Sequence, residues 1–199
     1  MLEEANRLIE QNPGYRVEII GGQLTATPPA DIPHSRVLNK ITRPLVAAGL
    51  DDGETEVHQG IGLWLPEGPE DYAIPDLVVV DADSDGHLVR NNCYDPVVFR
   101  LVLEVTSSNF NTDLRFKVGA YAQAMIPIYV IVNRKHQRVH VLTEPAGGEC
   151  GSHRVYAAGE LASLPDSLGA KVTLDVGELL AAGRPQPGKP GTPRETEGG

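Results

Sequence analysis

The chain has 199 residues, enough for one α/β domain with its own core. Its formal net charge of −10 argues against a protein that coats nucleic acid by bulk electrostatic attraction, but it is compatible with a nucleic-acid enzyme that carries a local basic stripe. No apolar run approaches the roughly 18 residues that span a bilayer, and the acidic N-terminus lacks the features of a signal peptide. We therefore expect a cytoplasmic protein with no membrane partner.

The first part of the chain predicts two helices on either side of a β-hairpin. Residues 2–11 have one apolar face and predict a short helix. Two alternating runs, 15–20 and 23–28, flank a Gly-Gly pair that supplies the positive φ of a tight turn. A second helix is expected from about Ser35 to residue 50, with a kink at Pro44.

The rest of the chain predicts a sheet with a helix between its strands. Residues 55–65 are strand-like, and the apolar runs 74–83 and 97–106 predict central strands buried on both faces. A helix is expected from about Asn111 to Met125. The remaining expected elements are strands at 128–133, 138–144 and 153–159, and a final helix at 176–182 into which residues 171–175 lead. We thus expect a single domain over residues 1–182, followed by a flexible Pro/Gly-rich tail at 183–199.

Two acidic residues lie at the ends of the expected central strands. Asp76 begins one strand and Glu104 closes the other. A carboxylate beside such apolar runs is costly to bury without a partner, and two carboxylates repel each other unless a cation intervenes. A divalent metal resolves that conflict. On the following helix, Asp113, Lys117 and Tyr121 are spaced four residues apart and share one face, which adds a positive charge.

Structural roles would also account for each of these residues taken alone. Asp76 follows a proline and suits a turn. An ion pair with Arg100 or Arg115 would explain Glu104, and Asp113 with Lys117 would form an ordinary surface pair. Only the combination of Asp76, Glu104 and Lys117, in this order along the chain, points to a functional site.

The combined motifs resemble the Uma2 family, which belongs to the PD-(D/E)XK nuclease superfamily. The resemblance covers roughly residues 14–144. The matching motifs around the expected site are Pro75-Asp76, EVTS from Glu104, D-x-x-x-K-x-x-x-Y on the helix, and IPIYVIVN. Two N-terminal stretches match as well: the opening hairpin GYRVEIIGGQLTATPPA with Glu18, and HSRVLNKI. Thr106 stands where the superfamily usually has its lysine. Lys117 on the helix takes that place, as in the Uma2 pattern.

This resemblance implies an α/β fold with a restriction-endonuclease-like core, in which helices flank a mixed sheet and an N-terminal β-hairpin precedes it. It implies metal-dependent phosphodiester hydrolysis, with DNA as the expected substrate and a homodimer as a plausible assembly. Asp76, Glu104 and the backbone carbonyl of Val105 would hold Mg²⁺ or Mn²⁺. Lys117 would orient the attacking water, and Glu18, Asp113 and Tyr121 would have supporting roles.

Two other functions fit the same residues. The first is a binding or regulatory module that kept the nuclease fold without useful turnover. The second is glycoside hydrolysis by two carboxylates, which needs neither a lysine nor a metal. His136 and His140 lie in an expected β-hairpin with several basic neighbours, and we interpret that turn as a solvated tip rather than a zinc site.

Overall fold

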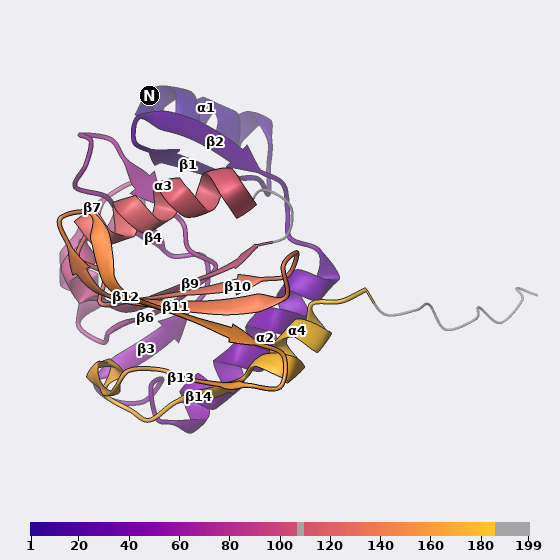
Figure 1. Cartoon of the computed structure of the whole chain (residues 1–199). Helices are drawn as coiled ribbons and strands as arrows, with labels where there is room; N and C mark the ends of the chain where they lie inside the picture. Colours follow the sequence, from indigo (N-terminus) through magenta and orange to yellow (C-terminus); the bar gives the residue numbers. More distant parts are fainter. Residues whose placement is uncertain (107–109, 186–199) are drawn as a thin grey trace, which may run out of the picture.

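The structure, a computed structural model, describes residues 1–106 and 110–185, without the side chains of residues 110–115. Within this part, the N-terminal hairpin of a second sheet lies on one side of helix α3, and a central sheet lies on its other side (Figure 1). Two further helices, α2 and α4, cover the opposite face of the central sheet. The expected mixed sheet flanked by helices, with an N-terminal hairpin, is confirmed.

The described residues form a central sheet of six strands in the order β12-β11-β10-β9-β6-β3. Its members are β3 (Thr55–His58), β6 (Leu77–Asp81), β9 (Phe99–Thr106), β10 (Ile128–Asn133), β11 (Arg138–Ala146) and β12 (Glu149–Ala157). Strands β9 and β10 are parallel and joined by α3 (Phe110–Gln123), whereas the other neighbouring pairs are antiparallel. The strands predicted to be central, β6 and β9, are neighbours in the sheet.

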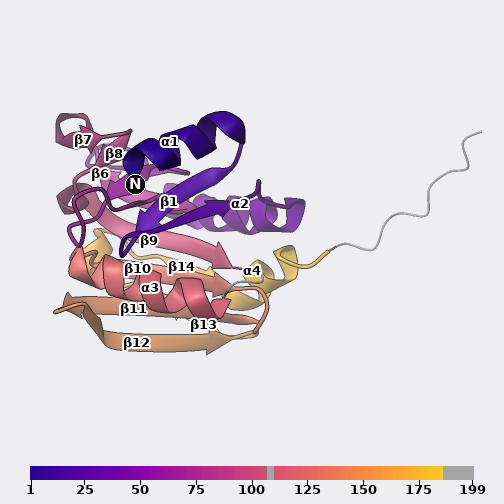
Figure 2. The ribbon, with the colours of Figure 1, turned by 90° about the horizontal axis from the view of Figure 1, so that it is seen from above.

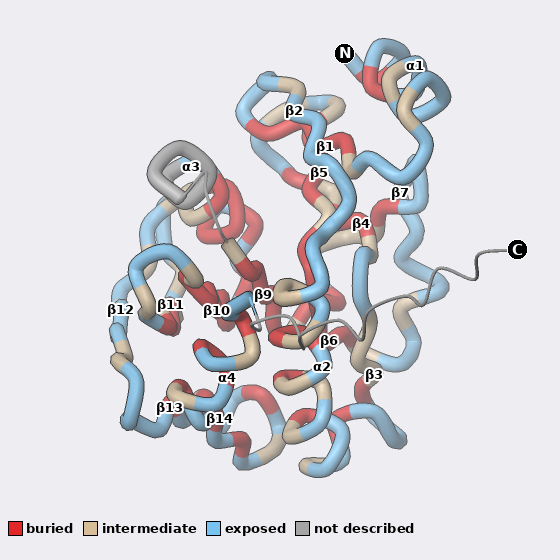
Figure 3. Tube along the Cα trace, turned by 90° about the vertical axis from the view of Figure 1, so that its right-hand side faces the viewer, coloured by how far each residue is buried: buried red, intermediate tan, exposed pale blue. Residues whose placement is uncertain are grey.

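Alternating side chains of β9 enter two different cores. Leu101, Leu103 and Val105 pack with α2 (Ile32–Ala47) and α4 (Val176–Ala182). Val102 packs with residues of α3 on the other face. Because side chains alternate along a strand, Glu104 faces α3. Figure 3 shows how continuously the central strands are buried, and Figure 2 shows α3 lying over them.

The second sheet of the described region has the order β2-β1-β5-β4-β8-β7. Its strands are β1 (Arg16–Ile20), β2 (Gln23–Thr27), β4 (Gly62–Trp64), β5 (Tyr72–Ala73), β7 (Leu88–Arg90) and β8 (Cys93–Tyr94). Helix α1 (Leu2–Gln11) packs on Val17 and Ile19 of β1. The opposite face of β1, which carries Arg16, Glu18 and Ile20, therefore points toward α3.

Several predicted boundaries were wrong, each for a local reason. Helix α2 begins at Ile32 instead of Ser35 because the Asp31 side chain caps it, accepting the backbone N–H of His34 at 2.7 Å. The run 55–65 is two strands in different sheets, divided where Gly60 adopts a φ of 69°. Helix α3 ends at Gln123, and Met125 already has a φ of 56°.

The chain from residue 84 to the C-terminus contains more regular structure than expected. The polar connection at 84–95 includes β7 and β8, and β12 begins at Glu149 rather than residue 153. A small two-stranded sheet pairs β13 (Leu161–Ser163) with β14 (Thr173–Asp175), and short 3₁₀ helices occur at Ser84–His87, Pro96–Val98 and Asp166–Leu168.

The expected tail at 183–199 lies mostly outside the described residues, so both the tail and the single-domain boundary stay predictions. In the described part, no helix combines the length and apolar character needed to cross a membrane.

Candidate active site

Strand pairing brings the two predicted acidic residues together. Strand β6 runs antiparallel to β9 with Leu77 opposite Leu103, so Asp76 lies beside the end of β9 that carries Glu104 and Val105. The backbone N–H of Val105 donates to Asp76 Oδ2 at 2.7 Å. The N–H and C=O of one residue in an extended strand face the same neighbour, so the Val105 carbonyl lies on the Asp76 side.

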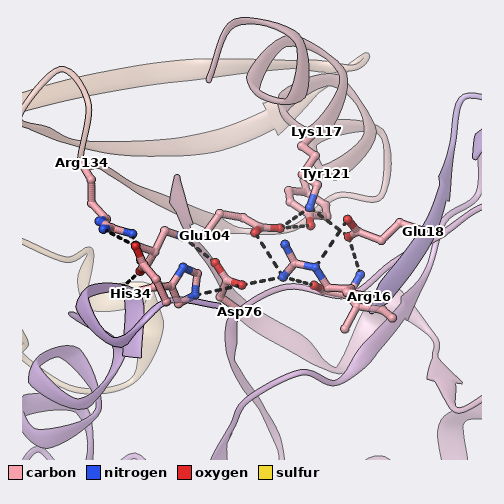
Figure 4. A network of polar contacts seen from close by, with 11 residues as sticks. Arg16, Glu18, His34, Asp76, Glu104, Lys117, Tyr121 and Arg134 are labelled. Carbon is pink, nitrogen blue, oxygen red and sulfur yellow. Dashed lines mark hydrogen bonds and ion pairs between the residues drawn. The ribbon is translucent and has the colours of Figure 1, made fainter. Parts of the chain in front are cut away.

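Helix α3 places a lysine and a tyrosine on the Glu104 carboxylate (Figure 4). Lys117 Nζ donates to Glu104 Oε1 at 2.7 Å, and Tyr121 OH donates to the same oxygen at 2.9 Å. All three side chains are buried. The predicted spacing of four residues is what lets both α3 side chains reach one oxygen.

Glu18 of β1 joins the cluster from the hairpin side. Its Oε1 accepts from Lys117 Nζ at 2.9 Å and from the backbone N–H of Ile74 at 2.8 Å. Lys117 thus links two carboxylates that come from different sheets. The position of the hairpin over α3 is fixed here by a buried ion pair as well as by apolar packing.

A second cation, Arg16, lies among the same carboxylates and was missed by sequence reasoning. Its Nη1 donates to Asp76 Oδ1 at 2.5 Å and to the carbonyl of Ile74 at 3.0 Å. Arg16 Nη1 is also 3.9 Å from Glu104 Oε2, and its Nε is 3.7 Å from Glu18 Oε2. The alternation of β1 could have revealed it, because Arg16 is two residues before Glu18 and shares its face.

His34, in the first turn of α2, was also missed as a neighbour of the site. Its Nε2 lies 3.4 Å from Asp76 Oδ1. The sequence gives no periodic signal for this contact, since it depends on where the cap at Asp31 begins the helix.

Burial and charge shift the pKa values of the carboxyl groups in opposite directions. Burial alone raises the pKa of Asp76, but the hydrogen bond from His34 and the charge of Arg16 lower it overall to about 2. Complete burial raises the pKa of Glu104 to about 7 against the attraction of Lys117. Burial lowers the pKa of Lys117, and the charges of Glu104 and Glu18 outweigh this effect, so its pKa is raised overall.

The cluster borders a cavity of about 790 Å³. The side chains of Phe116 and Arg134 also line this cavity, as do the loop residues 28–31 that lead into α2. Arg134 forms a two-point ion pair with Asp31, with both N–O distances at 2.9 Å. The buried carboxylates therefore adjoin a space of the size that small-ligand pockets have.

The donor set suits a hard divalent cation such as Mg²⁺, which one or two carboxylates typically hold together with water and substrate oxygens. Asp76 and Glu104 meet this requirement, and the Val105 carbonyl lies on the same side. Across the described part of the chain, no group of three His, Cys, Asp or Glu side chains is arranged to hold a metal ion. Metal binding here would therefore depend on the two carboxylates and on what Arg16 does between them.

The contacts of Arg100 and Lys117 differ from the structural roles that the sequence left open for Glu104 and Lys117. Arg100 pairs with Asp81 at 2.5 Å and not with Glu104, and Lys117 is a buried residue bound to Glu18 and Glu104. The Asp113 side chain and Ser107 to Asn109 lie outside the described residues. At the basic hairpin, His140 Nδ1 lies 2.9 Å from His153 Nε2 on β12.

The fold and the site geometry define a restriction-endonuclease-like protein with an acidic cluster at the ends of neighbouring strands. The sequence matches the model of the Uma2 family, described as "Putative restriction endonuclease", over residues 2–177, so the chain belongs to the Uma2 family. Among curated proteins, none matches the chain.

A solved structure has the same fold. It is the crystal structure of a putative nuclease belonging to DUF820 from Anabaena variabilis, with a TM-score of 0.64 and 12% sequence identity. The similarity covers 84% of this chain and 91% of that one. At this identity the likeness establishes the fold alone.

Proposed function

We propose that this protein is an endonuclease that uses Mg²⁺ or Mn²⁺ to hydrolyse phosphodiester bonds of DNA. The observation that carries the proposal is the buried group of Asp76, Glu104 and Lys117 at the base of an open cavity. A surface ion pair needs no such burial, and a structural core has little use for three buried charged groups. Membership of the Uma2 family supports the same chemistry.

The role proposed for each residue follows from where it lies in the site. Asp76, Glu104 and the Val105 carbonyl would hold the metal ion, which lowers the pKa of a bound water and offsets charge on the scissile phosphate. Glu18 and Tyr121 position the others, because Glu18 holds Lys117 from the hairpin side and Tyr121 fixes the Glu104 oxygen that Lys117 also contacts. Lys117 presents a buried positive charge beside the reacting phosphate, where such a charge acts in a low dielectric.

Cleavage is expected to depend on a divalent metal. Supercoiled plasmid incubated with the protein and Mn²⁺ or Mg²⁺ should become nicked and then linear, and excess chelator should stop the reaction. Single-stranded DNA and RNA of matched length, run in parallel, identify the preferred substrate. Cleavage that continues in chelator would contradict the proposal. The predicted homodimer is checked on the same preparation by light scattering.

A local basic surface supports a nucleic-acid substrate despite the acidic net charge. Arg36, Lys40 and Arg43 recur along one face of α2 and line a groove of about 510 Å³ that also borders α4. The first turn of the same helix contains His34, which lines the cavity beside the acidic cluster. A phosphate backbone that leaves the cavity along α2 would therefore meet a row of cations. Lys40 is engaged with Glu178 at 2.9 Å, which leaves the two arginines as the stronger phosphate ligands.

The double substitution Arg36→Gln and Arg43→Gln is expected to weaken binding to duplex DNA without a preference for sequence. Each lost phosphate contact lowers the slope of log K against log salt by about 0.9, so the slope should fall by about 2. Fluorescence anisotropy over a salt series in Ca²⁺ measures both quantities. The matched control is Arg7→Gln with Arg90→Gln, two exposed arginines on α1 and β7, away from α2 (Figure 1). An equal loss in the control would contradict a specific role for α2.

One observation favours the second candidate, a nuclease-fold module with little or no turnover. Asp76 Oδ1 and Glu104 Oε2 already have Arg16 as a cationic neighbour, so the charge of the cluster is nearly balanced without a metal ion. Such a module would bind DNA normally and show no cleavage with either metal. The plasmid assay and the anisotropy measurement together distinguish the two functions.

A further inference from the structure

The guanidinium of Arg16 lies between the two carboxylate oxygens that would bind a metal. Asp76 Oδ2 is engaged by the Val105 N–H, and Glu104 Oε1 is engaged by Lys117 and Tyr121. The remaining oxygens, Asp76 Oδ1 and Glu104 Oε2, both have Arg16 Nη1 as a neighbour, at 2.5 and 3.9 Å (Figure 4). One nitrogen therefore lies where a metal ion would bridge the two acids.

The two cations of the cluster are not held equally well. The Lys117 side chain is 9% exposed, and it bonds the carboxylates of Glu18 and Glu104. The Arg16 side chain is 25% exposed and lines the cavity. Its Nε is buried and has no hydrogen-bond partner among the described residues. The guanidinium therefore makes fewer hydrogen bonds than its five N–H donors allow. Arg16 is thus the cation that can leave.

The charges also favour exchange over addition. The cluster contains three carboxylates, from Glu18, Asp76 and Glu104, and Lys117 neutralises one of them. A divalent ion in place of the arginine head group neutralises the other two, whereas Arg16 neutralises only one. An ion that entered while Arg16 stayed would leave a surplus positive charge at close range, which costs free energy in a buried site.

We propose that Arg16 is a resident cation of the active site, which a divalent metal must displace from Asp76 and Glu104 in order to bind. This inference rests on the proposed metal site. Arg16 then sets the metal affinity: it keeps the carboxylates neutralised and the hairpin in place when metal is scarce, and it moves into the cavity when metal binds. Its role is in positioning and competition, and no step of the hydrolysis is assigned to it.

The test is a calorimetric titration of Mn²⁺ into the wild-type protein and Arg16→Met, which keeps the length and apolar stem of the side chain. The variant is expected to bind Mn²⁺ at least about tenfold more tightly, because no internal cation competes. The matched control is Arg100→Met. Arg100 also pairs with an aspartate at 2.5 Å, but with Asp81, which lies at the end of β6 away from Asp76, so its removal should leave the Mn²⁺ affinity unchanged.

A second measurement uses the wild-type chain and does not depend on how the variant folds. The Nε–H resonance of Arg16, assigned through Arg16→Lys, is followed by ¹⁵N NMR as Mg²⁺ is added. Displacement should shift this resonance in step with metal binding, whereas the Arg100 resonance should not move.

The outcomes separate this inference from the proposed function. If the wild-type protein binds metal and Arg16→Met binds no more tightly, or if the Arg16 resonance stays unshifted at saturating Mg²⁺, the inference is wrong and the metal site stands. If neither protein binds metal, the inference and the metal dependence of the proposed function are both wrong.

Discussion

Asp76→Asn is expected to abolish metal-dependent DNA cleavage while the protein stays folded. Asparagine keeps the size of the side chain, and its oxygen can still accept the Val105 N–H that Asp76 binds at 2.7 Å. It removes one of the two negative charges available to a metal ion. Metal-ion stabilisation of the transition state is worth several kcal/mol, so a loss of about a thousandfold in rate is expected in the plasmid assay.

The control for this substitution lies on β6, the strand that Asp76 directly precedes. Asp81→Asn removes a carboxylate at the other end of β6, where Arg100 is its partner, and should leave the cleavage rate nearly unchanged. Circular dichroism checks that both variants are folded. Asp76→Asn with a rate within tenfold of wild type would mean that the reacting phosphate binds elsewhere.

Lys117→Met is expected to destabilise the fold by about 3–5 kcal/mol at pH 8, besides stopping cleavage. The ammonium is the shared partner of Glu18 and Glu104, whose side chains are only 3% and 4% exposed. Without Lys117 these two buried carboxylates lose their nearest compensating cation. Urea denaturation of variant and wild type measures the difference in the free energy of unfolding.

The destabilisation should shrink as the pH falls. Burial already raises the pKa of Glu104 to about 7, and the loss of Lys117 raises it further. A carboxyl whose pKa is higher in the folded than in the unfolded state binds its proton more tightly when folded, so acid stabilises the folded form. The gap between variant and wild type should therefore be smaller at pH 5.5 than at pH 8. An equal gap at both pH values would mean that packing, and not charge, holds Lys117.

Two comparisons isolate the role of charge at Lys117. Adding Glu104→Gln to Lys117→Met removes one of the two buried carboxylate charges that lost Lys117 as a partner, and should restore part of the stability. Lys40→Met, which breaks an exposed pair with Glu178, should cost less than about 1 kcal/mol.

The parts of the site that follow local periodicity could be predicted from the sequence. Glu104 occurs at the end of an apolar strand, and the four-residue spacing of Lys117 and Tyr121 places both on it. Strand alternation around Glu18 carries similar information. These residues contact one another as expected, although their catalytic roles stay predictions.

The parts that depend on distant contacts could not be predicted. Alternation places Arg16 on the same face of β1 as Glu18, but its contact with Asp76, 60 residues away, depends on the pairing of β1 with β5, which has no local signal. His34 reaches the cluster because the Asp31 cap begins α2 earlier than its apolar pattern suggests. The run at 55–65 looks like one strand because Val57, Ile61, Leu63 and Leu65 recur along it, but Gly60, with a positive φ, lies where the chain passes from one sheet to the other.

The linkage of Glu18 to Lys117 spans 99 residues and has a consequence for protein synthesis. The emerging chain carries Arg16 and the acidic residues Glu18, Asp76 and Glu104 before the lysine that pairs with two of these acids has been made. Three carboxylates with Arg16 alone as an internal cation resist burial together, so we expect the hairpin to pack stably against the sheet only after α3 has been made. A polypeptide that stops short of residue 117 is therefore expected to lack the assembled cluster and, with it, the proposed activity.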